Sequence, residues 1–167
     1  MGEKLEEIKY LFYFYKIIIY KMKLTHTMIV MFVGSFIIQY FLMPPIMVNS
    51  IKDITNNIGK AYSSIIMGLS MVILEVMMFD NHYGVISYNL YTILFSLLAL
   101  FIYLYRKQVA VDDKQYLEGM IEHHSMALIT SEEILKKTND YNIAKLAKNI
   151  IQTQTDEIRV MRELLQK

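Results

Sequence analysis

The sequence contains no cysteine, only two prolines in 167 residues, and few charged side chains. Without cysteine, the chain cannot form a disulfide framework, a thiolate metal site or a thiol nucleophile. Charged residues make up 20% of the chain and the formal net charge is +1. Nucleic-acid binding normally requires a basic patch, so no nucleic-acid partner is expected. Because cysteine is absent, any soft metal ligand must be a methionine, and the sequence contains 13 methionines.

Hydrophobic residues make up 54% of the chain and gather in three runs, at residues 27–48, 61–79 and 86–105. Each run is long enough to cross about 30 Å of hydrocarbon at about 1.5 Å per helical residue. Soluble helices normally keep one polar face, which these runs lack. The runs predict an integral, multi-pass membrane protein with the lipid bilayer as its partner. Pro44 and Pro45 are expected to kink or stop the first helix, and Ser64 and Gly68 could allow close packing of the second.

The predicted spans divide the chain into three parts. Residues 1–24 mix aromatic residues with lysines and predict a helix lying along the membrane surface. Residues 25–106 form the three-helix transmembrane region, and residues 107–167 form a charged C-terminal domain. With three spans, five basic residues lie on each side of the membrane, so the positive-inside rule gives no orientation by itself. Greater weight on the first span favours a cytoplasmic N-terminus, which would place the C-terminal domain on the non-cytoplasmic side.

The C-terminal domain reads as two amphipathic helices, at about 112–137 and 143–166, separated by the break "TNDYN" at 138–142. So short a break predicts an antiparallel helical hairpin. At about 100° per residue, the first helix places His124 near the middle of its apolar stripe and His123 at the edge. The stripe predicted on the second helix consists of Ile143, Leu146, Ile150, Gln154, Glu157, Met161 and Leu164.

Folding this hairpin about residues 139–140 brings polar groups together on its inner faces. His124 is expected to face Gln154 and Glu157, and Met120 to face Glu157 and Met161. Buried polar groups need partners, which could be one another, water or a metal ion. The residues alone leave open whether they form a metal site or a polar core network.

The segments "DDKQYLEGMIEHHSMALITSEEIL" and "IAKLAKNIIQTQTDEIRVM" resemble the DUF305 family (domain of unknown function 305), a ferritin-like helical family. The resemblance extends over roughly the last third of the chain, and the three preceding spans resemble a membrane-anchored branch. Glu122 departs from the family pattern, since proline is common there. Residues that match the pattern are Asp113, Met120, Ile121, His123, His124, Ala127, Leu146, Ala147, Gln154, Glu157, Ile158 and Met161.

Some members of this family are described as copper-binding proteins, so the resemblance implies a metal site, with copper favoured. Imidazole suits Cu(II), thioether suits Cu(I), and a carboxylate can complete either site. Di-iron chemistry fits poorly, because the hairpin supplies one inward glutamate and a peripheral aspartate. Sequestration or handling of copper is therefore expected, without enzymatic activity. The expected metal ligands are His123, His124, Met120, Glu157, Met161 and Asp113, with Gln154 supporting them.

Two helices bury too little surface to be stable alone. The hairpin must therefore pack on the ends of the spans or pair with a second copy. The ferritin-like resemblance implies the second solution, a four-helix bundle formed by a homodimer. The expected fold is thus all-α, with three transmembrane helices followed by this hairpin. The alternative function is a structural or interaction membrane protein whose His/Gln/Glu network only fixes helix pairing.

Overall fold

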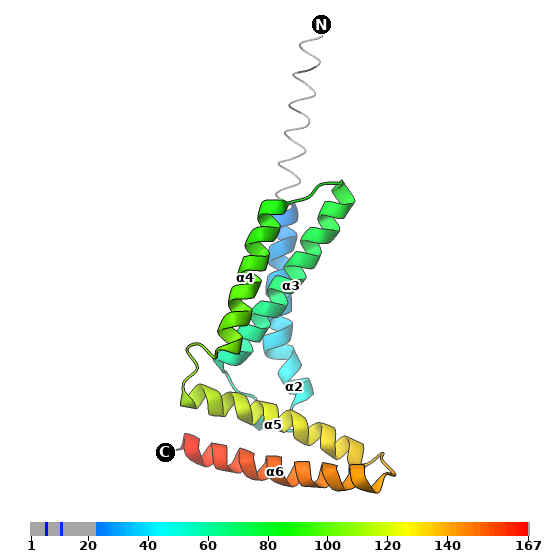
Figure 1. The fold of residues 1–167 in the computed structure, drawn as a ribbon, viewed down its shortest axis with the longest axis vertical. Coiled ribbons are helices and arrows are strands. Elements are labelled where there is room, and N and C mark those ends of the chain that lie inside the picture. The colour runs from blue at the N-terminus through cyan, green and yellow to red at the C-terminus, as the bar shows by residue number, and fades with distance from the viewer. Residues whose placement is uncertain (1–5, 7–10, 12–22, 167) are drawn as a thin grey trace.

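The computed structural model describes Glu6, Leu11 and residues 23–166. The helix predicted along the membrane surface, at residues 1–24, lies almost entirely outside these residues. In the described part every regular element is helical, which confirms the all-α prediction. Three helices stand side by side, and two more lie across one end of them (Figure 1).

The three upright helices are Lys23–Met47, α3 (Ile58–Tyr83) and α4 (Tyr88–Arg106), and each is long and apolar enough to cross a membrane. They begin and end within about four residues of the predicted runs. Their shared core consists of Leu24, Leu69, Val72, Ile73, Val76 and Leu94. Most of their remaining surface is apolar and exposed, as a lipid-facing surface would be.

The two prolines do not stop the first helix. Neither proline can donate a backbone hydrogen bond, so the regular α-helical ladder is interrupted there. Just before the prolines the helix widens into a π-helical segment, η1 (Ile38–Leu42). There the Met43 N–H donates a hydrogen bond to the Ile38 carbonyl, five residues earlier. One further turn follows, α2 (Met43–Met47), before the chain becomes extended at Val48.

Gly68 lets the first helix approach α3 closely, as predicted. A Cβ built on Gly68 would lie 2.8 Å from a ring carbon of Phe32 and 3.2 Å from the Phe32 carbonyl oxygen. Ser64, one turn earlier, is fully buried. At the other end of α3, Gly84 takes the left-handed conformation that ends the helix.

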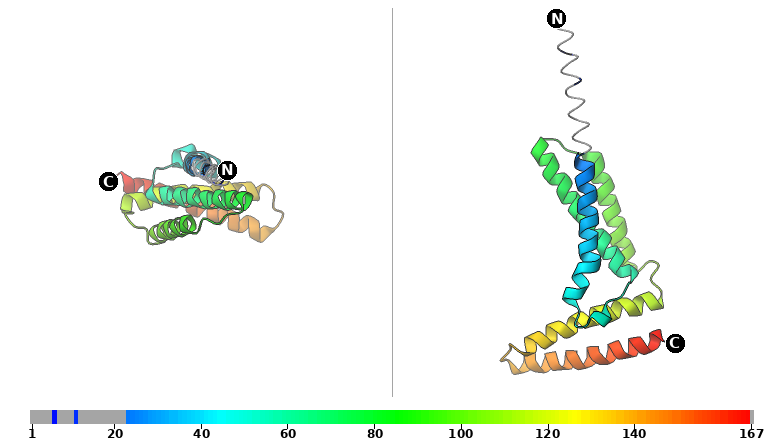
Figure 2. Two further views of the ribbon diagram at one scale, coloured as in Figure 1. Left: turned by 90° about the horizontal axis from the view of Figure 1, so that it is seen from above. Right: turned by 180° about the vertical axis from the view of Figure 1, so that it is seen from behind.

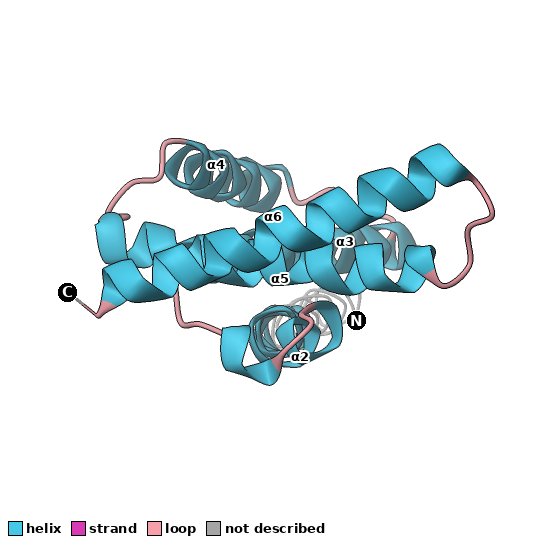
Figure 3. Ribbon diagram, turned by 90° about the horizontal axis from the view of Figure 1, so that it is seen from below, coloured by secondary structure: helices cyan, strands magenta, loops and turns pink. Residues whose placement is uncertain are grey.

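The C-terminal hairpin consists of α5 (Asp113–Leu135) and α6 (Tyr141–Leu165). Asp112 and Asp140 cap their N-termini by accepting backbone N–H bonds from the first turns. Viewed from below, α5 crosses the ends of the upright helices and α6 lies on its outer side (Figure 3). The view from behind also shows the hairpin lying across the ends of the upright helices (Figure 2).

The face that α6 turns toward α5 differs from the predicted stripe. The inner face consists of Ala147, Ile151, Gln154, Ile158, Met161 and Leu165, all buried or half-buried. Leu146 is instead 60% exposed, and Ile143 and Leu164 are also exposed. The predicted stripe was centred between the inner face and a second apolar face of α6, because the apolar arc is wider than one stripe.

Candidate functional site

His124 and Glu157 meet between the two helices of the hairpin, as predicted. His124 Nδ1 lies 3.0 Å from Glu157 Oε2; the His124 side chain is 14% exposed and that of Glu157 is 49% exposed. The two atoms are not aligned for a hydrogen bond, and Nδ1 has no hydrogen-bond partner among the described residues although it is buried. A buried nitrogen without a partner is costly, so this atom is available to a ligand.

The thioethers predicted for the site flank the same region. Met161 is buried in the hairpin core with Ile121, Leu128 and Ile158, and Met120 packs against that cluster. Gln154 is half-buried on the inner face of α6. The hairpin therefore places the imidazole beside the carboxylate, and both thioethers in or against its apolar core.

Two other predicted ligands lie elsewhere. His123 is exposed and lines a separate cavity, and its ring centroid is 6.1 Å from that of His124. Asp113 is exposed in the first turn of α5, about 16 Å from His124 along a helix that rises about 1.5 Å per residue. Over the part of the chain that the structure describes, no three His, Asp or Glu side chains converge. A hairpin site within one copy therefore relies on methionine beside His124 and Glu157.

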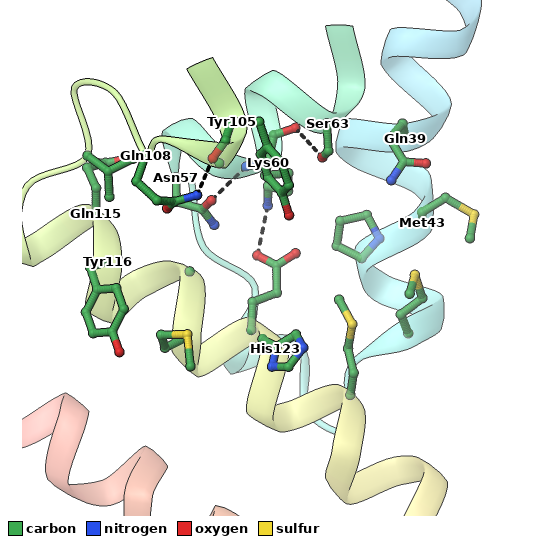
Figure 4. Close-up of a pocket in the computed structure, with 18 residues that line it drawn as sticks. Gln39, Met43, Asn57, Lys60, Ser63, Tyr105, Gln108, Gln115, Tyr116 and His123 are labelled. Carbon is green, nitrogen blue, oxygen red and sulfur yellow. Dashed lines mark hydrogen bonds and ion pairs between the residues drawn. The ribbon is translucent and has the colours of Figure 1, made fainter. Parts of the chain in front are cut away.

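The cavity that His123 lines lies between the hairpin and the upright helices and has a volume of about 430 Å³. Figure 4 shows His123 on the α5 side, with Gln39 and Met43 across from it on the first helix. The lining also includes Met47, Met120, Met126, Lys60, Glu122, Tyr105, Tyr116 and Gln115.

A buried ion pair forms one wall of this cavity. Lys60 Nζ lies 3.1 Å from Glu122 Oε2, and the two side chains are only 8% and 6% exposed. The same carboxylate oxygen accepts hydrogen bonds from the Thr55 N–H and hydroxyl, each at 3.1 Å. The Lys60 ammonium also donates to the Thr55 carbonyl and lies 5.0 Å from the centre of the Tyr40 ring. Such dense pairing offsets the cost of burying two charges.

A second polar group ties the loop after the first helix to both helices of the hairpin. Asp53, which is 3% exposed, accepts a 2.6 Å hydrogen bond from Ser125 on α5 and is paired with Arg162 on α6. Ser125 Oγ also accepts a hydrogen bond from the Asn49 N–H at 2.9 Å.

Unlike the buried Asp53 group, Glu133 forms its ion pair with Lys136 on the surface of the hairpin. The hydrogen bond and the positive charge of Lys136 hold the pKa of the Glu133 carboxyl below its ordinary value.

The sequence reading missed these loop contacts. Nothing in the helical periodicity pairs Glu122 with Lys60 or Thr55, which lie more than sixty positions away in the sequence. The one available indication was that Glu122 and Ser125, three residues apart, place polar groups on one face of α5.

Comparison with known proteins agrees with the resemblance seen in the sequence. The sequence profile described as "Domain of unknown function (DUF305)" matches residues 103–165. A protein of Acanthamoeba polyphaga mimivirus, "Uncharacterized protein L153", is 34% identical over 137 residues, which span 82% of this chain and 90% of that protein. No solved structure matches the chain significantly.

Proposed function

The chain belongs to the DUF305 family, and from this premise we propose that it is an integral membrane protein whose hairpin binds a metal ion, with copper favoured. The role is sequestration or handling of the ion rather than catalysis. The three long apolar helices support membrane insertion. The greater weight of the first span in the positive-inside rule favours a hairpin on the non-cytoplasmic side.

The observation that carries the metal proposal is the buried His124 Nδ1, which has a carboxylate oxygen at 3.0 Å and no hydrogen bond in the described structure. A metal ion would satisfy both groups, since a neutral imidazole and an ionised carboxylate are each good ligands. Met120 and Met161 add thioethers, which suit Cu(I) and rarely bind hard ions. The donor set therefore fits copper better than iron, calcium or magnesium.

A second copy of the chain is the proposed partner of the hairpin. The second apolar face of α6 consists of Ile143, Leu146, Ile150, Thr153, Val160 and Leu164. Its residues recur at intervals of three or four, as in helix–helix packing, except between Thr153 and Val160, where Glu157 occupies the intervening position. Glu157 therefore lies on this face, with its side chain 49% exposed in the single copy. A two-fold partner seated here would enclose Glu157 and bring a second His124–Glu157 pair nearby.

The alternative is a structural or interaction protein in which His124 and Glu157 only fix how α5 and α6 pair. Their 3.0 Å contact favours this alternative as well, because protonation of His124 would turn it into an ion pair. The two functions differ in one measurable respect, since only the metal site retains copper.

The test is the copper content of the full-length protein, purified in mild detergent without chelator, loaded with Cu(II) and passed through gel filtration. We expect His124→Ala and Glu157→Gln each to weaken retention at least about 10-fold, as loss of groups that hold a metal does. His82→Ala is the matched control, since His82 is exposed at the opposite end of α3. Circular dichroism checks that each variant remains helical.

Equal trace copper in the wild-type protein and in His124→Ala would refute the metal proposal. Loss of helicity or of thermal stability in His124→Ala, with no copper retained by the wild type, would instead favour the structural alternative.

A further inference from the structure

Two helices from different parts of the chain direct methionines at the same cavity. Met43 and Met47 are four residues apart in α2, so they lie on one face. Met120, His123 and Met126 are spaced by three residues in α5 and also share a face. All five side chains line the 430 Å³ cavity between the first helix and the hairpin. Figure 4 shows this arrangement around His123 and Met43.

Of these methionines, Met43, Met47 and Met126 line the cavity without belonging to either buried core, whereas Met120 also packs against the hairpin core. Methionine serves most often as an adaptable packing residue, which brings its thioether into contact on all sides. Here Met47 is 37% exposed and His123 is exposed, and both line a cavity that is open to solvent on one side. By comparison, Met161 is 8% exposed within the hairpin core. The cavity leaves room for an ion and gives it access to the side chains.

The electrostatics of the cavity do not oppose a cation. Lys60 is the buried cation in its wall, and Glu122 neutralises it at 3.1 Å. The remaining lining is uncharged and mostly apolar, with a few polar side chains that include Gln39, Asn57 and Gln115. Thioether and imidazole groups without a free carboxylate select soft monovalent ions such as Cu(I) and Ag(I), and discriminate against hard divalent ions.

We propose that this cavity is a second metal site, specific for Cu(I), formed by thioethers of Met43, Met47 and Met126 with the imidazole of His123. Met120 lies between this site and the hairpin site. The inference goes beyond the site at His124 and Glu157, because it uses residues of the first helix that lie outside the 103–165 match. A bound ion would join the first helix to α5 and so hold the hairpin against the upright helices.

The experiment measures anaerobic Cu(I) binding to the full-length protein in lipid nanodiscs, by competition with a chromogenic Cu(I) chelator, in a His124→Ala background that removes the hairpin site. We expect one equivalent of Cu(I) to remain and X-ray absorption to show sulfur ligands. Replacement of Met43, Met47 and Met126 by leucine should weaken that equivalent at least about 10-fold, the scale expected when supporting ligands are lost. Leucine is similar in volume to methionine, so packing should change little.

The matched control replaces Met67, Met77 and Met78 by leucine, because these methionines are exposed on α3 away from the cavity. The control should bind Cu(I) like the parent protein. A structural readout accompanies binding: Cu(I) should slow hydrogen exchange in residues 48–57, which connect the two layers, and should fail to do so in the triple Met variant.

Absence of sulfur scattering in the His124→Ala protein would overturn the proposal whatever the variants do. Equal Cu(I) affinity in the cavity variant and the control variant would also overturn it. Neither result bears on copper retention at His124 and Glu157, which is measured with Cu(II), so failure of one site is distinguishable from failure of the other.

Discussion

At the scale of single residues, the hairpin contact was predictable from the sequence and the loop contacts were not. His124 and Glu157 could be paired because a short break and a fixed helical period set the register of an antiparallel hairpin. Whether His123 lines the cavity depends on how the hairpin packs against the upright helices. That packing is determined by loop atoms such as the Asp53 carboxylate, which follow no helical period.

The Lys60–Glu122 pair gives the residue-scale prediction. Glu122→Ala should destabilise the packing of the hairpin by about 3–5 kcal/mol, because it leaves a buried ammonium without its counter-charge. The double variant Lys60→Met with Glu122→Leu should be less destabilised than Glu122→Ala alone, since no unpaired charge remains. Thermal unfolding in detergent measures both.

The control for that pair is Lys114→Met, which removes a 3.9 Å pair with Glu118 in which the lysine side chain is 70% exposed. Exposed pairs contribute between about 0 and 1 kcal/mol, so little change is expected. If Glu122→Ala melted at the same temperature as Lys114→Met, the pair would have no structural role.

At the scale of elements, α6 shows where a periodicity argument succeeds and where it loses resolution. The bounds of the helix were close to those predicted, because Asp140 supplies a capping side chain at the break. Its orientation was off by part of a turn, because two neighbouring apolar faces average into one apparent stripe. The exposed Leu146 and Val160, 60% and 45% exposed, belong to the face that remains uncovered in a single copy.

That face gives the element-scale prediction. The variant Leu146→Lys with Val160→Lys should convert a dimer into a monomer, because charges at the centre of an apolar helix interface lack partners there. Gln152→Lys is the control, since Gln152 is exposed on the polar face of α6. Light scattering in detergent, corrected for bound detergent, measures the mass. A wild-type protein that is monomeric at all concentrations would contradict the second-copy proposal.

At the scale of the whole molecule, the sequence left open whether the hairpin is stabilised by packing on the ends of the spans or by pairing with a second copy. Two helices alone bury too little apolar surface. In the structure, α5 is covered on one side by the ends of the upright helices and on the other by α6 (Figure 1). Gln115 Oε1 accepts a 2.6 Å hydrogen bond from the Ile58 N–H, which ties α5 to the start of α3. The hairpin and the apolar helices are therefore one packed unit.

Asp53, in the loop between the first helix and α3, can test that unit because its carboxylate bonds to Ser125 on α5 and pairs with Arg162 on α6. Asp53→Ala removes the acceptor of Ser125 and the counter-charge of Arg162. Loss of a partner from buried polar groups costs about 1–3 kcal/mol. Since about 1.4 kcal/mol corresponds to a factor of ten, amide exchange in residues 48–57 should accelerate about 5- to 150-fold. Arg159→Ala, which loses only pairs within α6, should leave that exchange unchanged. Unchanged exchange in Asp53→Ala would mean that apolar contact alone holds the hairpin against the upright helices. A metal ion bound between them would then add little to the stability of residues 48–57.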